Sequence, residues 1–187
     1  MKVSETTLPG VYLIEPRVFP DQRGFFQEIW QATRYTQAHM PGPFVQDNHS
    51  HSTHGTLRGL HYQLKHPQGK LVWVVQGEVF DVAVDIRVGS PTFGRWFGTI
   101  LSSDNHRQLY VPAGFAHGFC VLSASADCLY KCTDLYAPGD EYGLRWDDPC
   151  LAIDWPITTP LLSERDRQYP TLDTIPWDHL PVFRAGL

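Results

Sequence analysis

The feature that most constrains the fold is a close succession of short β-prone runs with little sequence between them. Eight such runs span 44–52, 56–63, 71–75, 78–86, 96–101, 108–111, 117–122 and 127–136. Turn-forming residues separate several of them, as at Gly77, Asp104-Asn105 and Pro112-Ala113-Gly114. Parallel strands need crossover connections of about a dozen residues or more, and these gaps are shorter. The pattern therefore predicts an all-β, antiparallel sandwich or barrel of the jelly-roll kind.

The flanking segments add little regular structure to this β region. Val11 to Glu15 is apolar and is closed by Pro16, which predicts a first strand. After Pro149 the chain becomes Pro-rich, and Ser163-Glu164-Arg165-Asp166 resembles a capped helical turn. We therefore expect residues 1–187 to form a single domain with a few short peripheral helices. The closing section should wrap the barrel, with residues from about 175 to 187 as a C-terminal tail.

Charge and hydropathy exclude two classes of partner. The formal net charge is −5 and no run of Lys or Arg is present, so we expect no nucleic-acid partner, and an anionic ligand must meet a few local cations. No stretch approaches the roughly 20 apolar residues that span a bilayer. The N-terminal residues lack the apolar core of a signal peptide, so we expect a cytoplasmic protein without a membrane association.

Chemically useful side chains gather between Gly55 and Lys70. A histidine suits general-base catalysis because its usual pKa of about 6.5 is close to working pH, which makes His61 a candidate base. A cation beside it can stabilise a developing oxyanion, and Lys70 is the candidate. Taken alone, each is also compatible with an ordinary barrel-lining histidine or surface lysine. Strict alternation from Arg58 sends His61 to the opposite face, so we predict a β-bulge at Gly59 that restores their convergence.

Two further groups of side chains share a strand face. Alternation groups Cys128, Tyr130 and Cys132 on one face, which we expect to be the barrel interior. Tyr130 there can donate a proton opposite the base, or it can be a packed core tyrosine. Alternation also predicts that Phe26 and Glu28 share a face, where an aromatic plate beside an acceptor suits a nucleobase. The alternative is a core phenylalanine beside a solvated glutamate.

The histidines raise the question of a metal site. Cupins, the metal-binding jelly rolls, carry Gly-x5-His-x-His-x3/4-Glu and later Pro-x-Gly-x2-His. This chain has Gly55-x5-His61-x-Gln63 without the following Glu, and it matches the second motif up to His117. An amide and a missing carboxylate make a poor site for a transition metal, so we predict no metal and a cupin-like barrel. His49-x-His51 is the remaining alternative.

The four cysteines have no paired Cys-x-x-Cys spacing. A chain of this length does not need disulfides to hold its core. We therefore expect buried free thiols at Cys120, Cys128, Cys132 and Cys150.

Several longer motifs occur in order along the chain. They are Arg23-Gly-Phe-Phe-Gln-Glu28, Leu57-Arg-Gly-Leu-His-Tyr-Gln63, Gln68-Gly-Lys-Leu71, Gly77-Glu-Val-Phe-Asp-Val-Ala-Val-Asp-Ile-Arg87, Ser90-Pro-Thr-Phe-Gly94, Pro112-x-Gly-Phe-Ala-His-Gly-Phe119 and Leu129-Tyr-Lys131. From about residue 3 to residue 170 the chain resembles the dTDP-4-dehydrorhamnose 3,5-epimerase family. The resemblance implies a homodimeric jelly roll without a cofactor. By this resemblance the protein would invert C3 and C5 of dTDP-4-dehydro-6-deoxy-α-D-glucose to give dTDP-4-dehydro-β-L-rhamnose, in dTDP-L-rhamnose biosynthesis.

The resemblance also implies roles for individual residues. His61 would be the base, oriented by Asp166, Tyr130 would be the acid, and Lys70 would hold the enolate oxygen at O4. Residues implied for the nucleotide, diphosphate and sugar are Arg23, Phe26, Glu28, Gln46, Asn48, Arg58, His117, Glu141 and Arg165. Tyr136 matches a family tyrosine beside the sugar, and some of these residues would reach across the dimer interface.

Departures from the family pattern leave alternatives open. The family often has Tyr-Tyr where this chain has Leu135-Tyr136, and Lys where it has Arg165. An arginine keeps the charge but not the shape of a lysine. The alternatives are a 3-only or 5-only epimerase of a related dTDP-4-keto-6-deoxy sugar, and a non-catalytic barrel that binds a sugar nucleotide or a carbohydrate.

Overall fold

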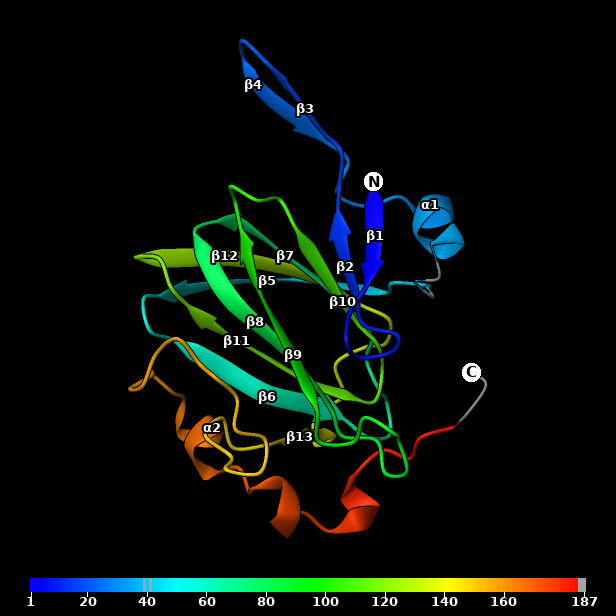
Figure 1. The fold of residues 1–187 in the computed structure, drawn as a ribbon, viewed down its shortest axis with the longest axis vertical. Coiled ribbons are helices and arrows are strands. Elements are labelled where there is room, and N and C mark those ends of the chain that lie inside the picture. Colours follow the sequence, from blue (N-terminus) through cyan, green and yellow to red (C-terminus); the bar gives the residue numbers. More distant parts are fainter. Residues whose placement is uncertain (39, 41, 185–187) are drawn as a thin grey trace.

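A computed structural model of the chain describes residues 1–38, 40 and 42–184, and its strands form a jelly roll of two facing sheets (Figure 1). The six-stranded sheet has the order β1 (Lys2–Glu5), β2 (Tyr12–Glu15), β10 (Gln108–Val111), β7 (Lys70–Gln76), β12 (Ser125–Cys132) and β5 (Gln46–Thr53). The five-stranded sheet has the order β13 (Glu141–Gly143), β6 (Leu57–Gln63), β11 (Phe115–Val121), β8 (Glu78–Asp85) and β9 (Trp96–Ser102). All strand pairs within both sheets are antiparallel, which confirms the predicted fold class.

The eight predicted runs all became strands, with ends that differ by a few residues. The largest difference is at the last run, since β12 ends at Cys132 and residues 133–136 leave the sheet. The predicted first strand corresponds to β2, but β1 precedes it and pairs with it. The sequence Lys-Val-Ser-Glu of β1 has too little apolar content to signal a strand, because this edge strand buries neither face completely.

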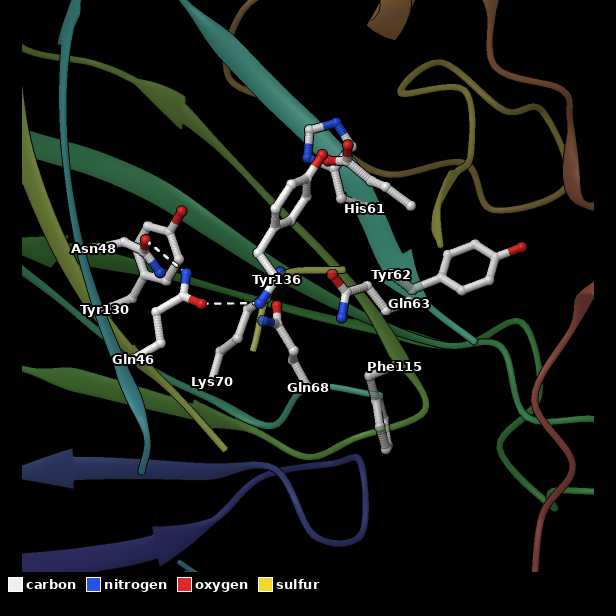
Figure 2. A pocket seen from close by; sticks show the side chains of 11 residues that line it. Gln46, Asn48, His61, Tyr62, Gln63, Gln68, Lys70, Phe115, Tyr130 and Tyr136 are labelled. Carbon is white, nitrogen blue, oxygen red and sulfur yellow. Dashed lines mark hydrogen bonds between the residues drawn. The ribbon is translucent and has the colours of Figure 1, made fainter. Parts of the chain in front are cut away.

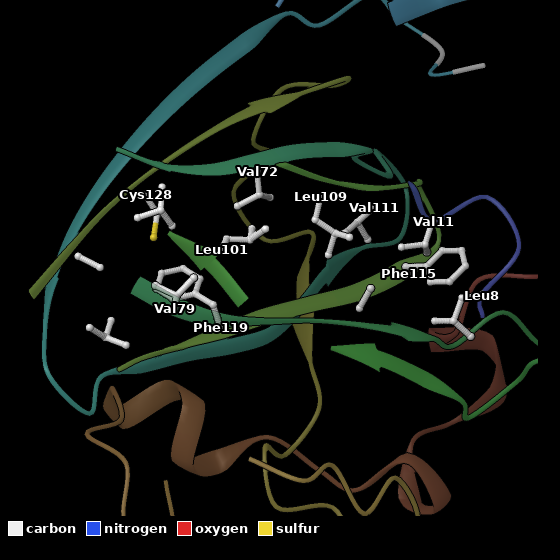
Figure 3. Packing of buried hydrophobic residues seen from close by; sticks show 14 residues of the cluster. Leu8, Val11, Val72, Val79, Leu101, Leu109, Val111, Phe115, Phe119 and Cys128 are labelled. Atoms are coloured by element: carbon white, nitrogen blue, oxygen red, sulfur yellow. The ribbon is translucent and has the colours of Figure 1, made fainter. Parts of the chain in front are cut away.

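The main core lies between the two sheets (Figure 3). Inward side chains from the two sheets meet there, and they include Val72, Leu109, Val79, Phe119 and Cys128. Tyr130 packs against this cluster, so the face that carries Cys128, Tyr130 and Cys132 is the barrel interior as predicted.

The closing section covers the outer face of the five-stranded sheet. It contributes α2 (Glu164–Gln168), η1 (Leu172–Thr174) and η2 (Trp177–His179), and it buries Trp155, Leu172 and Leu180 against residues of β6 and β8. Val182 forms a bridge to Val88, so the tail stays packed on the barrel near its end. The closing section thus lies on the barrel as far as residue 184, and residues 185–187 of the predicted tail lie outside the described residues.

A small hairpin and one helix complete the described fold. β3 (Val18–Asp21) and β4 (Gly24–Gln27) pair only with each other and project away from the barrel (Figure 1). The helix α1 (Ala32–Gln37) follows them, and the side chain of Gln31 caps its N-terminus. Within the described ranges, no helix combines the length and the apolar content needed to span a bilayer.

The cysteine prediction was correct at three of the four positions. Cys120, Cys128 and Cys132 are buried free thiols, with Cys128 in the core between the sheets and Cys120 beneath the closing section. Cys150 is free but exposed, because it lies in a turn where Asp148 accepts its backbone N–H and its side chain faces away from the core.

Candidate active site

The centre of the candidate site is a hydrogen-bonded pair of side chains, His61 and Asp166. His61 lies on β6, and Asp166 lies in the first turn of α2, where the Ser163 hydroxyl accepts the Asp166 N–H. The Nε2 atom of His61 lies 2.5 Å from Oδ1 of Asp166, whose side chain is almost fully buried. Burial raises the pKa of Asp166, but hydrogen bonds from His61 and Ser163 outweigh it and lower that pKa below its usual value. An ionised carboxylate can therefore hold the imidazole and leave its Nδ1 for a substrate proton.

The predicted bulge at Gly59 is present. In the pairing of β6 with β11, His61 faces His117 and Arg58 faces Phe119, so Gly59 and Leu60 together oppose one residue. Gly59 has a φ of 122°, a conformation that side-chain-bearing residues rarely adopt. The extra residue turns both Arg58 and His61 toward one cavity, as the sequence predicted.

The cavity consists of two adjoining lobes that share four residues: His61, Lys70, Tyr130 and Glu141. The first lobe is also lined by Gln46, Asn48, Tyr62, Gln63, Gln68, Phe115 and Tyr136 (Figure 2). The second lobe is also lined by Ser50, Arg58, His117, Phe119, Ser163, Arg165 and Asp166. The structure therefore brings together eleven of the fourteen residues that the sequence predicted for the site.

Lys70 and Tyr130 reach the cavity from the sheet opposite His61. Lys70 begins β7, and Tyr130 lies on the neighbouring strand β12. Burial lowers the pKa of Lys70, although electrostatic interactions with Cys132, Glu141 and Asp81 oppose this effect. Burial also raises the pKa of Tyr130, so its hydroxyl keeps its proton at neutral pH. The imidazole of His61 and the hydroxyl of Tyr130 thus approach the same space from opposite sheets.

A second histidine–carboxylate pair joins His117, which lines the second lobe, to Asp81. Nε2 of His117 is 2.9 Å from Oδ1 of Asp81, and both side chains are buried. Asp81 was not predicted from the sequence. Alternation along β8 places it on the same face as the core residues Val79 and Ala83. A carboxylate at an inward position between Val79 and Ala83 is the sequence signal that could have identified it.

The remaining predicted residues of the cavity form two polar groups. Nε2 of Gln46 donates to Oδ1 of Asn48 at 2.9 Å, and Oε1 of Gln46 accepts the backbone N–H of Tyr136 at 2.8 Å. Arg165 forms an ion pair with Glu141 and also donates to its backbone carbonyl at 3.0 Å. Both groups lie at the wall of the cavity, where they can bond to a polar ligand.

Tyr169 is a further site residue that sequence reasoning missed. Its ring lies edge-on to the His61 imidazole, with ring centroids 5.6 Å apart. The ring occupies a slot over Gly143, where a Cβ atom would lie 2.4 Å from it. Tyr169 follows α2 in a polar stretch without strand or helix periodicity, so nothing in the local sequence indicated that it packs on His61.

Three predicted residues lie elsewhere in this protomer. Arg23 pairs with Asp21 at the exposed tip of the β3–β4 hairpin, and Phe26 is 70% exposed. Because β4 ends at Gln27, Glu28 leaves the strand and pairs with Arg34.

Phe26 and Glu28 line different hollows, so the predicted shared face is absent within the chain. The alternative of a core phenylalanine is also wrong, because the hairpin stands away from the barrel.

A transition-metal site needs three or four clustered imidazole, carboxylate or thiolate ligands. In the part of the chain that the structure describes, no three His, Cys, Asp or Glu residues are grouped to hold a metal ion. His49 and His51 do share a face, but both bond to Asp127, at 2.7 and 3.2 Å. The amide of Gln63 is bonded to backbone atoms.

Comparison with known proteins gives consistent matches over most of the chain. A sequence profile described as dTDP-4-dehydrorhamnose 3,5-epimerase matches residues 5–174. A dTDP-4-dehydrorhamnose 3,5-epimerase of Pseudomonas aeruginosa is 58% identical over 170 residues, which cover 90% of this chain and 94% of the relative. A dTDP-4-dehydrorhamnose 3-epimerase of Streptomyces niveus is 43% identical over 169 residues, which cover 89% of this chain and 82% of the relative.

A solved structure is similar over nearly the whole chain. It is the dTDP-6-deoxy-D-glucose-3,5-epimerase of Legionella pneumophila in complex with dTDP-4-keto-L-rhamnose. Its TM-score is 0.96 at 52% identity, and the match covers 98% of this chain and 99% of that one.

Proposed function

The chain belongs to the dTDP-4-dehydrorhamnose 3,5-epimerase family and is an epimerase of dTDP-L-rhamnose biosynthesis, and from this premise we propose that the cavity around His61 is its active site. The substrate would be dTDP-4-dehydro-6-deoxy-α-D-glucose and the product dTDP-4-dehydro-β-L-rhamnose. The observation that carries the proposal is the arrangement of His61 on one sheet and Tyr130 on the other, with Lys70 beside them.

The 4-keto group makes the chemistry possible at both flanking carbons. It acidifies the C–H bonds at C3 and C5, so one base and one acid on opposite ring faces can act twice. Nδ1 of His61 takes the proton from carbon, while Asp166 at Nε2 stabilises the imidazolium that forms. The electron pair of the C–H bond passes into the carbonyl, which becomes an enolate. Tyr130 then donates its hydroxyl proton to the opposite face of the carbon.

Lys70 would stabilise the enolate at O4. An ammonium in an enclosed cavity interacts strongly with a developing oxyanion, because little water screens the charge. The same enclosure lowers the pKa of Lys70, while the negative charges around the cavity oppose this. The proposed mechanism uses no metal and no cofactor.

The other cavity residues would bind the nucleotide sugar. Arg58 and Arg165 supply the local positive charge that a diphosphate requires in an acidic chain. Gln46, Asn48 and Tyr136 offer amide groups and an aromatic ring on the other lobe.

We propose a homodimer in which the β3–β4 hairpin carries Arg23, Phe26 and Glu28 toward a partner's cavity. The projection of this hairpin and the exposure of Phe26 support this arrangement. The cytoplasmic location stays a prediction from the sequence.

The test is incubation with dTDP-4-dehydro-6-deoxy-glucose in heavy water, with deuterium located by NMR. Uptake at both C3 and C5 is expected. His61→Ala should abolish uptake while dTDP still binds, which separates an enzyme from a binding barrel. No uptake by the unmodified protein would contradict the proposal.

Epimerisation at a single centre is the second candidate. It is favoured by the 43% identity to a relative named a 3-epimerase and by the departures at Leu135 and Arg165. The same experiment separates the two candidates, since a single-centre enzyme incorporates deuterium at one carbon only.

A further inference from the structure

Two loops frame the first lobe of the cavity. The loop of residues 64–69 joins β6 to β7 and leads to Lys70, and the loop of residues 133–140 joins β12 to β13 and carries Tyr136. The Tyr136 side chain is half exposed at the cavity wall, and its loop has no strand or helix structure. Its position therefore depends on the groups that hold the backbone of this loop.

Gln63 bonds to the backbone on both sides of Tyr136. Its Oε1 accepts the N–H of Ala137 at 3.0 Å, and its Nε2 donates to the carbonyl of Leu135 at 3.2 Å. The same Nε2 donates to the carbonyl of His66 in the other loop at 2.6 Å. Gln63 is 6% exposed, so little water can reach its amide. These backbone groups supply the hydrogen bonds that a buried amide needs.

Only a side-chain amide matches this set of partners. The carbonyls of Leu135 and His66 need a donor, and the N–H of Ala137 needs an acceptor. A carboxylate lacks the donor, and an apolar side chain lacks both. Gln63, which departs from the metal-binding cupin motif, thus has the side chain that matches the backbone groups of the two loops.

Other contacts hold the same region but do not bracket Tyr136. Gln46 accepts the N–H of Tyr136 itself, and Gln68 donates to the carbonyl of Asp134 at 2.8 Å. The carboxylate of Asp140 accepts three backbone N–H groups of residues 64–66. We therefore expect the loops to stay folded without Gln63, whereas the peptide units around Tyr136 would lose two bonds.

We propose that Gln63 is a positioning residue that fixes Tyr136 as a wall of the substrate cavity. This inference rests on the proposed function, because it requires that the nucleotide sugar contact Tyr136. Gln63 itself acts through the backbone of residues 135 and 137. Misplacement of a binding group by about 1 Å can cost up to about a hundredfold in rate, so the effect should be measurable.

The experiment is a double-mutant cycle on KM. Gln63→Met keeps the volume and removes all three bonds, and it should raise KM about tenfold with a smaller change in kcat. In a Tyr136→Ala background, Gln63→Met should change KM less than about twofold, because the residue it positions is absent. Gln37→Met, an exposed change on α1, is the matched control. Equal effects of Gln63→Met in both backgrounds would overturn the proposal.

A second variant keeps the test decisive if Gln63→Met folds poorly. In Gln63→Glu, a carboxylate faces two carbonyl oxygens, and a protonated carboxyl can donate to one of them. The activity of this variant relative to the unmodified protein should therefore rise as pH falls from about 8 to about 6. A ratio that does not change with pH would contradict the positioning role. Failure of the unmodified protein to epimerise would instead reject the proposed function.

Discussion

The imidazole of His61 and the carboxylate of Asp166 lie 2.5 Å apart, although 105 positions separate them in the chain. His61 belongs to the five-stranded sheet, and Asp166 belongs to the section that wraps its outer face. The pair therefore forms only when that section is packed on the barrel. This relationship links the folding of the closing section to the chemistry of the cavity.

Asp166→Asn should lower kcat by about a hundredfold or more, because the amide no longer stabilises the imidazolium or selects the tautomer of His61. Affinity for dTDP, measured by calorimetry, should change little. Asp147→Asn is the control, since Asp147 pairs with Arg145 on the surface outside the cavity. An unchanged kcat in Asp166→Asn would show that the carboxylate has no part in the reaction.

Tyr130→Phe should separate proton removal from proton delivery. The variant keeps the ring in the barrel interior but loses the hydroxyl that we propose protonates the opposite face of the substrate carbon. Deuterium exchange into the substrate should continue in heavy water, while formation of the epimerised product slows. NMR measures both rates in one sample. Equal loss of the two rates would count against Tyr130 as the acid.

Asp85→Asn should destabilise the protein by about 3 kcal/mol at pH 7, because it breaks a buried charge pair. The Asp85 carboxylate is fully buried and accepts hydrogen bonds from Arg87, Ser90 and Thr92. Burial raises the pKa of Asp85, but these bonds outweigh it and hold that pKa below the usual value. Urea unfolding of the variant and the unmodified protein measures the difference.

The pH dependence of that difference has a defined sign. Because the pKa of Asp85 is lower in the folded state, its contribution to stability is present above the unfolded pKa of about 3.9 and is lost as pH falls through the folded value. The difference between the two proteins should be constant from about pH 8 to pH 5 and shrink below about pH 4. A difference that grows on acidification would contradict this assignment.

The sequence predicted the parts of the site that lie on regular strands. Alternation along β12 placed Tyr130 inside the barrel, and the glycine beside Arg58 allowed the bulge on β6 to be predicted. Both predictions follow from the two-residue period of a strand, which can be read from the local sequence.

The sequence could not predict features that depend on loops or on separate segments. Phe26 and Glu28 were placed together because nothing local showed that β4 ends at Gln27. Tyr169 reaches His61 only through the path of the closing section across the sheet. The sequence showed only that Gln63 stands where cupins have a metal-binding histidine. Its backbone partners lie in loops, and a loop's conformation leaves no periodic pattern in the sequence.

The bulge gives the last prediction, a comparison of two glycines on either side of Arg58. A Cβ atom on Gly59 would lie 2.7 Å from the Cα of Gly118 and 2.8 Å from the carbonyl oxygen of His117, both in β11. Gly55 also has a positive φ, of 78°, but a Cβ there meets nothing within 4 Å. Gly55→Ala should therefore cost about 1 kcal/mol, the usual strain of a left-handed residue.

Gly59→Ala should cost about 3 kcal/mol or more, because β6 and β11 must separate to admit the methyl group. It should also lower kcat, since separation of these strands moves Arg58 and His61 away from the geometry that the bulge sets. Urea unfolding and the epimerase assay, applied to both variants, measure the two effects. Similar losses of stability in Gly55→Ala and Gly59→Ala would mean that positive φ, and not the close approach of the strands, requires glycine at position 59.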